Sequence, residues 1–290
     1  MRPPGDLPRP AEEGDELNAA ATAPGRTLSG VQKKLLVHAE EGRFRPSHQL
    51  ADPATHIAKL NQADLPTLVQ NEDISLKLAR EVLGPAEVTK AAIGTVQGVE
   101  GVALLVERFD RAAGQRLRLE DLAQILSKPR GREFDGKYQS SYEEAASAIA
   151  RYSVRPRIDL DRYFRLVVFN FVIGNADAHL KNFSLLERPE GLRLSPAYDL
   201  VNTVLYPFEA ITGLEIGGLK RPLDTLDRLL LEEFGRSIEL PPSAVSAALD
   251  QLAKRFAKAR TPELPLQVEP TDLRLRYREV VDANARRIFG

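Results

Sequence analysis

The sequence contains no cysteine and only four histidines among its 290 residues. The absence of cysteine excludes disulfides, thiol nucleophiles and cysteine-ligated zinc sites. The spacing of the histidines is not that of metal ligands; they are His38, His48, His56 and His179. No apolar run is long and uncharged enough to span a membrane, and the N-terminus lacks the apolar core of a secretory signal. We therefore expect a cytoplasmic protein without a membrane partner.

The chain also lacks an excess of charge of either sign. It has 40 basic and 41 acidic residues and a formal net charge of −1. Such a balance does not indicate a general nucleic-acid or membrane binder. The hydrophobic content of 43% is sufficient for a sizeable core, and the length suits one large domain or two lobes.

The first ordered segment is expected after a proline-rich start. Residues 1–25 contain five prolines and several acids, which predicts a flexible leader. From Thr27 the sequence TLSGVQKK continues into an apolar strand. Gly30 allows backbone amides to approach a phosphate, and Lys33 and Lys34 add positive charge. A surface turn before a strand is an equally good interpretation of this segment alone.

The most continuous apolar run covers residues 163–172, which predicts a helix buried in a core. Gly174 can end this helix. Four polar side chains then follow within six residues: Asp177, His179, Lys181 and Asn182. A buried helix that delivers polar groups to one point is a common way to build a rigid site.

Asp177 and Asn182 have the D-x-x-x-x-N spacing of a protein-kinase catalytic loop. In such a loop the aspartate accepts the proton of the phosphate acceptor, and the asparagine helps to hold magnesium. The segments 183–186 and 192–194 predict a hairpin, after which Asp199 occupies the position of the second metal-binding aspartate. The spacing alone is common, and loop aspartates without a chemical role are the alternative interpretation.

Two upstream segments fit the same pattern. Residues 55–60, THIAKL, predict a strand whose Lys59 has the position of the lysine that contacts the α- and β-phosphates in kinases. A lysine on an edge strand is the alternative. Residues 71–83 predict a helix capped by Asn71, in which Glu72 can pair with that lysine. A favourable interaction of Glu72 with the helix dipole is the competing interpretation.

The remaining pattern changes from strands to helices. Strands are expected at 91–96 and 101–106, and the charged segment Glu107 to Phe109 then suits the adenine-binding hinge between two kinase lobes. Helices are expected at 142–152, 223–234, 242–257 and 271–288. A β-rich half followed by an α-rich half is the order of a bilobal kinase.

Together these stretches resemble the HipA family of serine/threonine-kinase toxins. The resemblance rests on LSGVQKKLLV (28–37), THIAKL (55–60), NEDISLKLA (71–79), LLVERFDR (104–111), FVIGNADAHLKNFSLL (171–186) and LSPAYDL (194–200). It implies an α+β, bilobal protein-kinase-like fold with a β-rich N-lobe and an all-helical C-lobe. The expected division is a leader at 1–25, an N-lobe at 26–110 and a C-lobe at 111–290.

The resemblance also implies residue roles and cofactors, ATP and Mg²⁺. Asp177 is then the catalytic base, Asn182 and Asp199 hold magnesium, and Glu72 is the acid that pairs with the lysine. The residues implied in ATP binding are Ser29, Gly30, Val31, Gln32, Lys33, Lys34, Lys59, Glu107, Arg108, Phe109, His179, Lys181, Asn182, Tyr198 and Asp199.

One departure from the full-length family is the short segment ahead of the phosphate loop. It resembles the smaller HipT-type toxins of three-gene HipBST systems, in which a separate small HipS-like protein is similar to the missing subdomain. These toxins carry an S-x-S autophosphorylation pair, and Thr27 and Ser29 have those places here. A phosphate on either residue, beside Lys33 and Lys34, gives a local cause for silencing the kinase.

The implied function is that of a kinase toxin in a type II toxin–antitoxin system. The family phosphorylates an aminoacyl-tRNA synthetase, glutamyl- or tryptophanyl-tRNA synthetase, which inhibits translation and growth. The implied antitoxin is a HipB-like helix-turn-helix protein. No segment of this chain has a helix-turn-helix pattern, so DNA binding is expected only through that partner.

Two other classes of function are compatible with parts of the sequence. The first is a catalytically silent binding module that acts as a corepressor with a DNA-binding antitoxin. The second is a small-molecule kinase of the aminoglycoside-phosphotransferase type, which shares the D-x-x-x-x-N spacing. The segments SGVQKK and YDL argue against the second class.

Overall fold

The computed structural model describes residues 32–47, 54–112, 114–131, 135–264 and 272–290. Within these ranges strands dominate the first part of the chain and helices the second. The elements are β1 (Lys34–Glu40), β2 (Arg43–Pro46), β3 (His56–Leu60), α2 (Leu68–Val82), β4 (Ala91–Gly94), β5 (Ala103–Glu107), β6 (Arg111–Ala112), β7 (Gln115–Arg116), β8 (Leu119–Asp121), α3 (Leu122–Ile125), α4 (Tyr142–Tyr152), α5 (Pro156–Val172), β9 (Ser184–Arg188), β10 (Gly191–Leu194), α6 (Arg228–Ser237), α7 (Pro242–Lys258) and α8 (Leu273–Phe289). Short 3-10 turns are η2 (Asp135–Tyr138), η3 (Leu180–Asn182), η4 (Thr203–Leu205) and η5 (Leu223–Thr225).

The first part is a five-stranded antiparallel sheet in the order β2-β1-β3-β5-β4. Strand β3 is therefore central, and the edge-strand interpretation of Lys59 is wrong. In the register of β1 and β3, Lys34 stands directly opposite Lys59. Like charges in such a pair destabilise a sheet unless an acid lies between them.

The two faces of this sheet are buried differently. Because side chains alternate along a strand, Ala58 and Lys59 point to opposite faces. Ala58 joins a small cluster that includes Val37 and Leu105. On the other face Leu104 packs with α2 in the main core. Lys59 therefore lies under α2, where it is only 4% exposed.

Helix α2 begins three residues earlier than the sequence pattern predicts, at Leu68. Asn71 is therefore not its cap, because Thr67 has the N-cap position. The side chain of Asn71 is buried and pairs instead with the backbone of Asn202, in two hydrogen bonds of 2.9 Å each. The hydrogen-bond partners of the Asn71 side chain thus come from a distant segment. A capping rule considers only neighbouring residues and does not detect such partners.

The buried helix predicted from the apolar run is α5, and this prediction is confirmed. Pro156 opens it, which suits a position whose N–H has no partner within the helix. Gly174 follows its end with φ of 75°, in the left-handed region. A Cβ at Gly174 would lie 3.0 Å from both Asn202 Oδ1 and Val280 Cγ1, so the turn is also closely packed.

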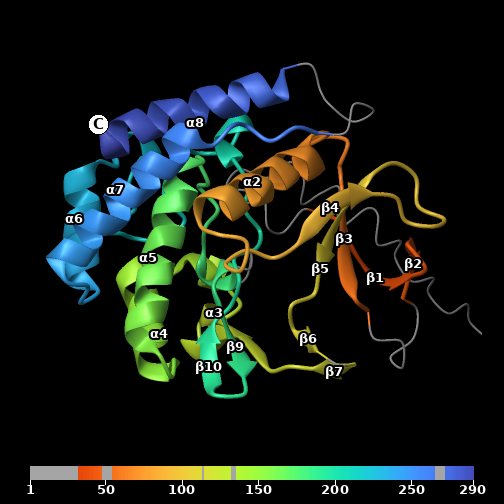
Figure 1. Cartoon of the computed structure of the whole chain (residues 1–290), viewed down its shortest axis with the longest axis horizontal. Helices are drawn as coiled ribbons and strands as arrows, with labels where there is room; N and C mark the ends of the chain where they lie inside the picture. The colour runs from red at the N-terminus through yellow and green to blue at the C-terminus, as the bar shows by residue number, and fades with distance from the viewer. Residues whose placement is uncertain (1–31, 48–53, 113, 132–134, 265–271) are drawn as a thin grey trace, which may run out of the picture.

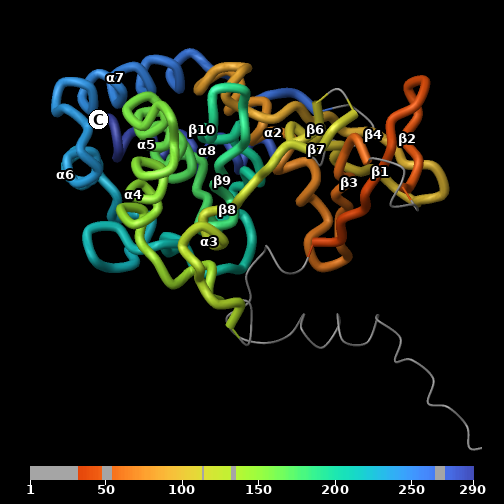
Figure 2. Tube along the Cα trace, turned by 90° about the horizontal axis from the view of Figure 1, so that it is seen from below, coloured from red at the N-terminus to blue at the C-terminus, as the bar shows by residue number. Residues whose placement is uncertain are grey.

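Helices α4, α6, α7 and α8 surround α5, as Figure 1 shows on the side away from the five-stranded sheet. The hairpin predicted at 183–194 forms as β9 and β10, and β8 adds a third strand that the sequence did not indicate. The second part is therefore mainly helical but not all-helical. This small sheet lies between the helices and the five-stranded sheet (Figures 1 and 2).

Most expected helix bounds hold within a few residues. Helix α4 spans Tyr142–Tyr152 as predicted, whereas α6 begins five residues late, at Arg228. Residues 223–225 instead form a 3-10 turn, and Asp227 caps α6 by accepting the Leu230 N–H at 2.9 Å. Among all the described ranges, no helix has the length and apolar character needed to cross a bilayer.

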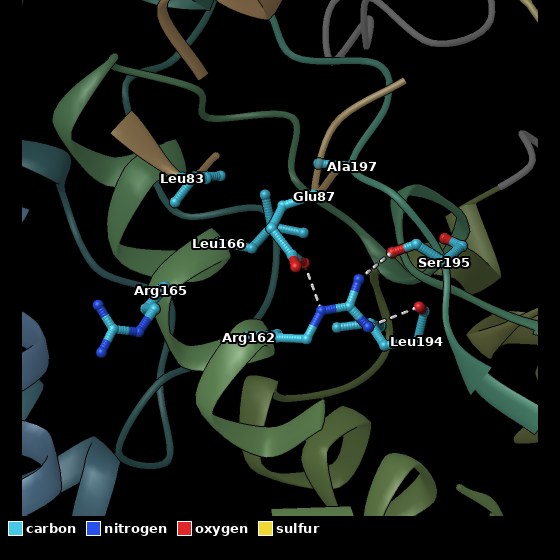
Figure 3. A pocket seen from close by; sticks show the side chains of 8 residues that line it. All are labelled: Leu83, Glu87, Arg162, Arg165, Leu166, Leu194, Ser195 and Ala197. Atoms are coloured by element: carbon cyan, nitrogen blue, oxygen red, sulfur yellow. Dashed lines mark hydrogen bonds and ion pairs between the residues drawn. The ribbon is translucent and has the colours of Figure 1, made fainter. Parts of the chain in front are cut away.

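A buried ion network fixes the end of the hairpin onto α5. Asp159, fully buried, accepts hydrogen bonds from Arg193 at 2.9 and 3.0 Å and from Arg162 at 2.9 Å. Figure 3 shows Arg162 reaching on to Glu87 and to the carbonyl oxygens of Leu194 and Ser195. The small pocket in that view is thus a structural joint that holds the chain just before Asp199.

Replacing Asp159 by asparagine tests this joint. Burial raises the pKa of Asp159, but the hydrogen bonds from Arg193 outweigh burial and hold the pKa below its usual range. Removal of the charge leaves two arginines without their partner, which typically costs about 3–5 kcal/mol for a buried pair. We expect urea unfolding at pH 7 to show this loss.

The control is Asp161→Asn, two residues along the same helix, where the ion pair with Arg165 is partly exposed. Its loss should stay below about 1 kcal/mol. Because the folded pKa of Asp159 is depressed, the difference between wild type and D159N is present above the unfolded pKa of about 4 and shrinks in stronger acid. Equal losses for both variants at pH 7 contradict the assignment.

Candidate active site

Two basic and two acidic side chains meet beneath α2. Lys59 Nζ donates to Glu72 Oε1 at 2.5 Å and also donates to Asp199 Oδ1. Lys34 Nζ lies 3.7 Å from the other oxygen, Asp199 Oδ2. Asp199 therefore lies between the two lysines that face each other across β1 and β3. The cluster joins the sheet, α2 and the segment after the hairpin.

The cluster shifts the ionisation of its members. Burial raises the pKa of Asp199, but Lys34 and Lys59 outweigh burial and hold the pKa far below its usual range. Burial alone would lower the pKa of Lys59, yet Asp199 and Glu72 raise it above its ordinary value. For Glu72 burial prevails over Lys59, so its pKa is raised. The charged lysine thus pairs most strongly with Asp199.

Asp199 also has an unusual backbone conformation, with φ of 54°. A non-glycine residue in the left-handed region costs roughly 1–2 kcal/mol, although aspartate tolerates it better than most residues. Such local strain is typical of functional positions that the surrounding fold holds in place. The Asp159 network immediately upstream and the Asn71–Asn202 pair immediately downstream supply that support.

A relay of amides positions the loop that follows α5. Asn170, inside the helix, accepts from Asn175 Nδ2 at 2.7 Å. Asn175 Oδ1 in turn accepts the backbone N–H of Asp177 at 3.0 Å. Asn170 itself donates to the Leu166 carbonyl at 2.9 Å. The buried helix therefore determines where the backbone of Asp177 lies.

Three further contacts clamp this loop from other elements. Thr203 Oγ1 accepts the Ala176 N–H at 2.7 Å, and the Tyr142 hydroxyl donates to the Ala178 carbonyl at 3.0 Å. A Cβ on Gly213 would lie 2.6 Å from that same carbonyl oxygen, so only glycine fits there. The loop is held in one geometry by parts of the chain on both sides of it.

The side chain of Asp177 is half-buried and already holds a hydroxyl. Tyr138, the last residue of η2, donates its hydroxyl to Asp177 Oδ1 at 2.5 Å. Five residues after Asp177, Asn182 closes a short turn by accepting the His179 N–H through Oδ1 at 2.9 Å. This leaves a second lone pair of the Asn182 carbonyl oxygen for a further partner.

His179 is buried between these groups and is neutral. Its exposed fraction is 1%, and neither ring nitrogen has a hydrogen-bond partner among the described residues. The edge of its ring meets the Tyr138 ring at a centroid distance of 4.9 Å. Burial first, and then the positive charge of Lys137, lower the pKa of His179 to about 3.

A cleft of ≈ 230 Å³ opens beside the ion cluster. The expected residues Lys34, Lys59, Lys181, Tyr198 and Asp199 line it, together with the hinge segment 107–109. The other lining residues are Ile57, Val106, Asp110, Leu119, Asp121, Gln124 and Ser184. The cleft combines apolar walls with the lysines and acids of the ion cluster at one side, which suits a ligand that is part apolar and part anionic.

The hinge segment offers fewer free backbone groups than the sequence suggests. The Glu107 N–H already donates to the Lys90 carbonyl at 2.8 Å, and the Arg108 N–H donates to the Thr55 carbonyl at 2.9 Å. These two backbone N–H groups are therefore already used within the fold. The Phe109 ring lies 5.6 Å from that of Tyr198 and forms an aromatic wall of the cleft.

Other expected site residues lie away from the cleft or outside the described part. Gln32 is half-buried and Lys33 is exposed, and neither lines the cleft. Asp177, His179 and Asn182 are likewise not among its lining residues. The predictions for Thr27 and for Ser29 to Val31 fall outside the described residues.

The candidate ligands for a metal ion in this site are the oxygens of Asn182 and Asp199. Within the described ranges no group of three or more histidine, cysteine, aspartate or glutamate side chains could hold a metal ion on its own. Asn182 and Asp199 instead offer an amide and a carboxylate oxygen. Magnesium is commonly bound by one or two such oxygens together with substrate phosphates, so these two residues fit it.

Sequence reasoning missed three parts of this site. Tyr138 and Lys137 lie in a segment without helical or strand periodicity, so no pattern pointed to them. Asn175 could have been found, because an asparagine two residues before Asp177 suits a loop cap. The clamp at Thr203 depends on a contact between residues 27 positions apart and has no local signal.

The chain matches the family model of the HipA-like C-terminal domain over residues 26–260. Y4mE of Sinorhizobium fredii is 33% identical over 194 residues, which cover 62% of this chain and 43% of that protein. The serine/threonine-protein kinase toxin HipA of Shewanella oneidensis is 30% identical over 273 residues, 86% of this chain and 59% of that protein. The chain thus spans about half of each relative's length.

Two solved structures share the fold. HipA in the complex of Shewanella oneidensis HipA, HipB and operator DNA matches with a TM-score of 0.70 and 24% identity, over 99% of this chain and 74% of that one. The Helicobacter pylori proinflammatory kinase CtkA matches with a TM-score of 0.55 and 12% identity, over 92% of both chains. The predicted kinase-like α+β fold is therefore confirmed.

The protonation state of His179 can be tested directly. With a pKa of about 3, the ring should remain neutral from pH 8 down to pH 5. Its ring signals in ¹⁵N–¹H NMR spectra should not titrate in that range, whereas in the urea-denatured chain they should shift near pH 6.5.

The same shift has a consequence for stability. Because the unfolded chain binds the proton more readily, the free energy of unfolding falls as pH drops from about 6.5 towards 3. His179→Asn should weaken this dependence. Titration of the His179 ring near pH 6.5 in the folded protein contradicts the assignment.

Proposed function

Since the chain belongs to the family of HipA-like C-terminal domains, we propose that it is an ATP-dependent protein serine/threonine kinase. The observation that carries the proposal is the contact of Lys59 with both Glu72 and Asp199 at the side of a cleft. A lysine charged under all ordinary conditions, placed in this way, can hold the phosphates of a nucleotide. The aromatic wall at Phe109 and Tyr198 receives the base.

Each polar group then has a role in phosphoryl transfer. Asp177 accepts the proton of the acceptor hydroxyl, and the acid Glu72 keeps Lys59 in place. Lys33, Lys34 and Lys181 add positive charge around the phosphates, and the sequence Ser29 to Gln32 offers backbone amides to them. Magnesium, held by Asn182 and Asp199 when bound, supplies charge compensation for the phosphate oxygens. Neutral His179 contributes a hydrogen-bonding ring without adding charge.

The biological role that we propose is that of a toxin. The Shewanella oneidensis relative is named as a kinase toxin, which supports this assignment. The substrate is then an aminoacyl-tRNA synthetase, glutamyl- or tryptophanyl-tRNA synthetase, and its phosphorylation stops translation and growth. Autophosphorylation at Thr27 or Ser29 limits the activity.

The neutralising partner that we propose is a HipB-like helix-turn-helix antitoxin, since the similar HipA structure contains HipB and operator DNA. The likeness to short HipT-type toxins adds a separate HipS-like protein as a further partner. Phosphosite mass spectrometry after incubation with Mg-ATP and a bacterial lysate would identify the substrate. A silent corepressor is the rival, which gains no phosphate and adds none to the lysate.

The role of Asp177 as the base predicts the effect of Asp177→Asn. The variant keeps the size of the side chain but loses its basicity, so transfer to protein should fall by about 10²–10⁴-fold. ATP binding, measured by calorimetry, should stay close to wild type. Asp161→Asn, on the outer side of α5, serves as the control and should keep full activity. Undiminished transfer by D177N rules out this role.

The proposed magnesium site predicts that Mg-ATP stabilises the wild type and the Asp199→Asn variant differently. Saturating Mg-ATP should raise the free energy of unfolding of the wild type by about 2.7 kcal/mol at one hundred times its dissociation constant. Asp199→Asn should remove the part of this gain that requires magnesium, so that Mg-ATP and ATP with EDTA become equivalent. If D199N keeps the magnesium-dependent gain, Asp199 does not hold the ion.

A further inference from the structure

The hydroxyl of Tyr138 occupies the position on Asp177 that a phosphate acceptor must take. A general base has to lie within about 2.6–3.2 Å of the hydroxyl whose proton it removes. The Tyr138 hydroxyl donates to Asp177 Oδ1 at 2.5 Å. The side chain is half-buried and comes from η2, which the relay behind Asp177 does not involve.

The Tyr138 ring is held by its neighbours and lies among positive charges. Its face receives two ammonium groups, Lys137 Nζ at 5.0 Å and Lys220 Nζ at 5.2 Å from the ring centroid. The edge contact with His179 restricts the ring from another side. The tyrosine is therefore preorganised against Asp177.

The segment that carries Tyr138 also faces the phosphate side of the site. Lys137 is 7% exposed, so its ammonium is directed inward. It interacts electrostatically with groups of both the catalytic loop and the ion cluster, namely Asp177, Lys181, Lys34 and Asp199. The Tyr138 hydroxyl, one residue further along, contacts the proposed base directly.

We propose that Tyr138 is itself a phosphoryl acceptor, modified within the same chain by the ATP bound there. This inference rests on the proposed kinase function. The contact of the Tyr138 hydroxyl with Asp177 supplies the base, and the two lysines at its ring supply the charge. It adds a modification site separate from Thr27 and Ser29.

The step balances with ATP as the only co-reactant. The Tyr138 Oη forms a bond to the γ-phosphorus, and the bond from that phosphorus to the oxygen bridging to the β-phosphate breaks. The electron pair of the broken bond leaves with ADP. The phenolic proton passes to Asp177 Oδ1 and from there to water.

The product differs from the starting state in charge. Phosphotyrosine carries about −1.5 to −2 charges at neutral pH, which Lys137 and Lys220 can neutralise. The same charge repels the Asp177 carboxylate, to which the hydroxyl previously donated. Modification therefore breaks the hydrogen bond between Tyr138 and Asp177.

The experiment is a time course of the full chain with Mg-ATP, read by phosphosite mass spectrometry and an anti-phosphotyrosine antibody. We expect phosphate on Tyr138 at a rate that does not change over a tenfold dilution of the protein, as transfer within one chain requires. Asp177→Asn should reduce this signal by at least tenfold. Lys220→Gln, which removes one charge at the ring, should slow it severalfold.

Two variants distinguish phosphorylation of Tyr138 from unspecific phosphorylation of other tyrosines. Tyr138→Phe keeps the ring but removes the acceptor hydroxyl, so it should lose the phosphotyrosine signal. Tyr152→Phe, at an exposed tyrosine on α4, should keep the signal unchanged. Circular dichroism of each variant verifies folding.

Failure of the inference and failure of the kinase function give different results. Phosphate on serine or threonine residues with none on Tyr138 overturns the inference and leaves the kinase function in place. A labelling rate at Tyr138 that rises in proportion to protein concentration also overturns it, because one chain then modifies another. The absence of both ATP binding and any incorporated phosphate overturns both proposals.

Discussion

The arrangement of the site depends on one ion cluster, in which Lys59 connects Glu72 to Asp199. The three residues come from a central strand, a helix and a segment that lies 140 positions further along the chain from Lys59. Lys59 and Glu72 are buried, and an unpaired buried charge costs several kcal/mol. The cluster therefore forms only when the sheet, α2 and the end of the hairpin are assembled together. Lys34 completes it because its strand sets it directly opposite Lys59.

The supports of Asp199 and Asp177 are built in the same way. Asp159 and its arginines hold the chain before Asp199, and the amides of Asn170 and Asn175 hold the backbone of Asp177. In both cases α5 supplies a buried polar residue, Asp159 or Asn170. A polar group inside a core destabilises the fold unless it has hydrogen-bond partners. Each of these residues therefore fixes the position of the segment to which it is bonded. A functional loop of few residues gains its rigidity from that helix.

The sequence predicted the parts of the fold that depend on local pattern. The apolar run of α5, the hairpin and the turn at Gly174 were found because periodicity and glycine have local causes. It placed Lys59, Glu72 and Asp199 by spacing and resemblance, without evidence that they touch. The start of α2 was wrong, because Asn71 bonds to a residue 131 positions away and not to its own helix. Tyr138 and the occupied hinge amides were missed for the same reason, since long-range contacts determine both.

The attachment of α2 has a consequence for how far this helix can move. In many two-lobed kinases the corresponding helix swings to make or break its ion pair, and this movement is the switch. Here Asn71 is bonded to the backbone of Asn202, Ser75 contacts the Tyr277 hydroxyl at 2.9 Å, and Arg255 donates to the last turn of α2 at 2.7 Å. These hydrogen bonds attach α2 to the helical part of the molecule. Rotation of α2 would break them and expose buried groups. A change of the Lys59–Glu72 pair by rotation of α2 would therefore require these hydrogen bonds to break.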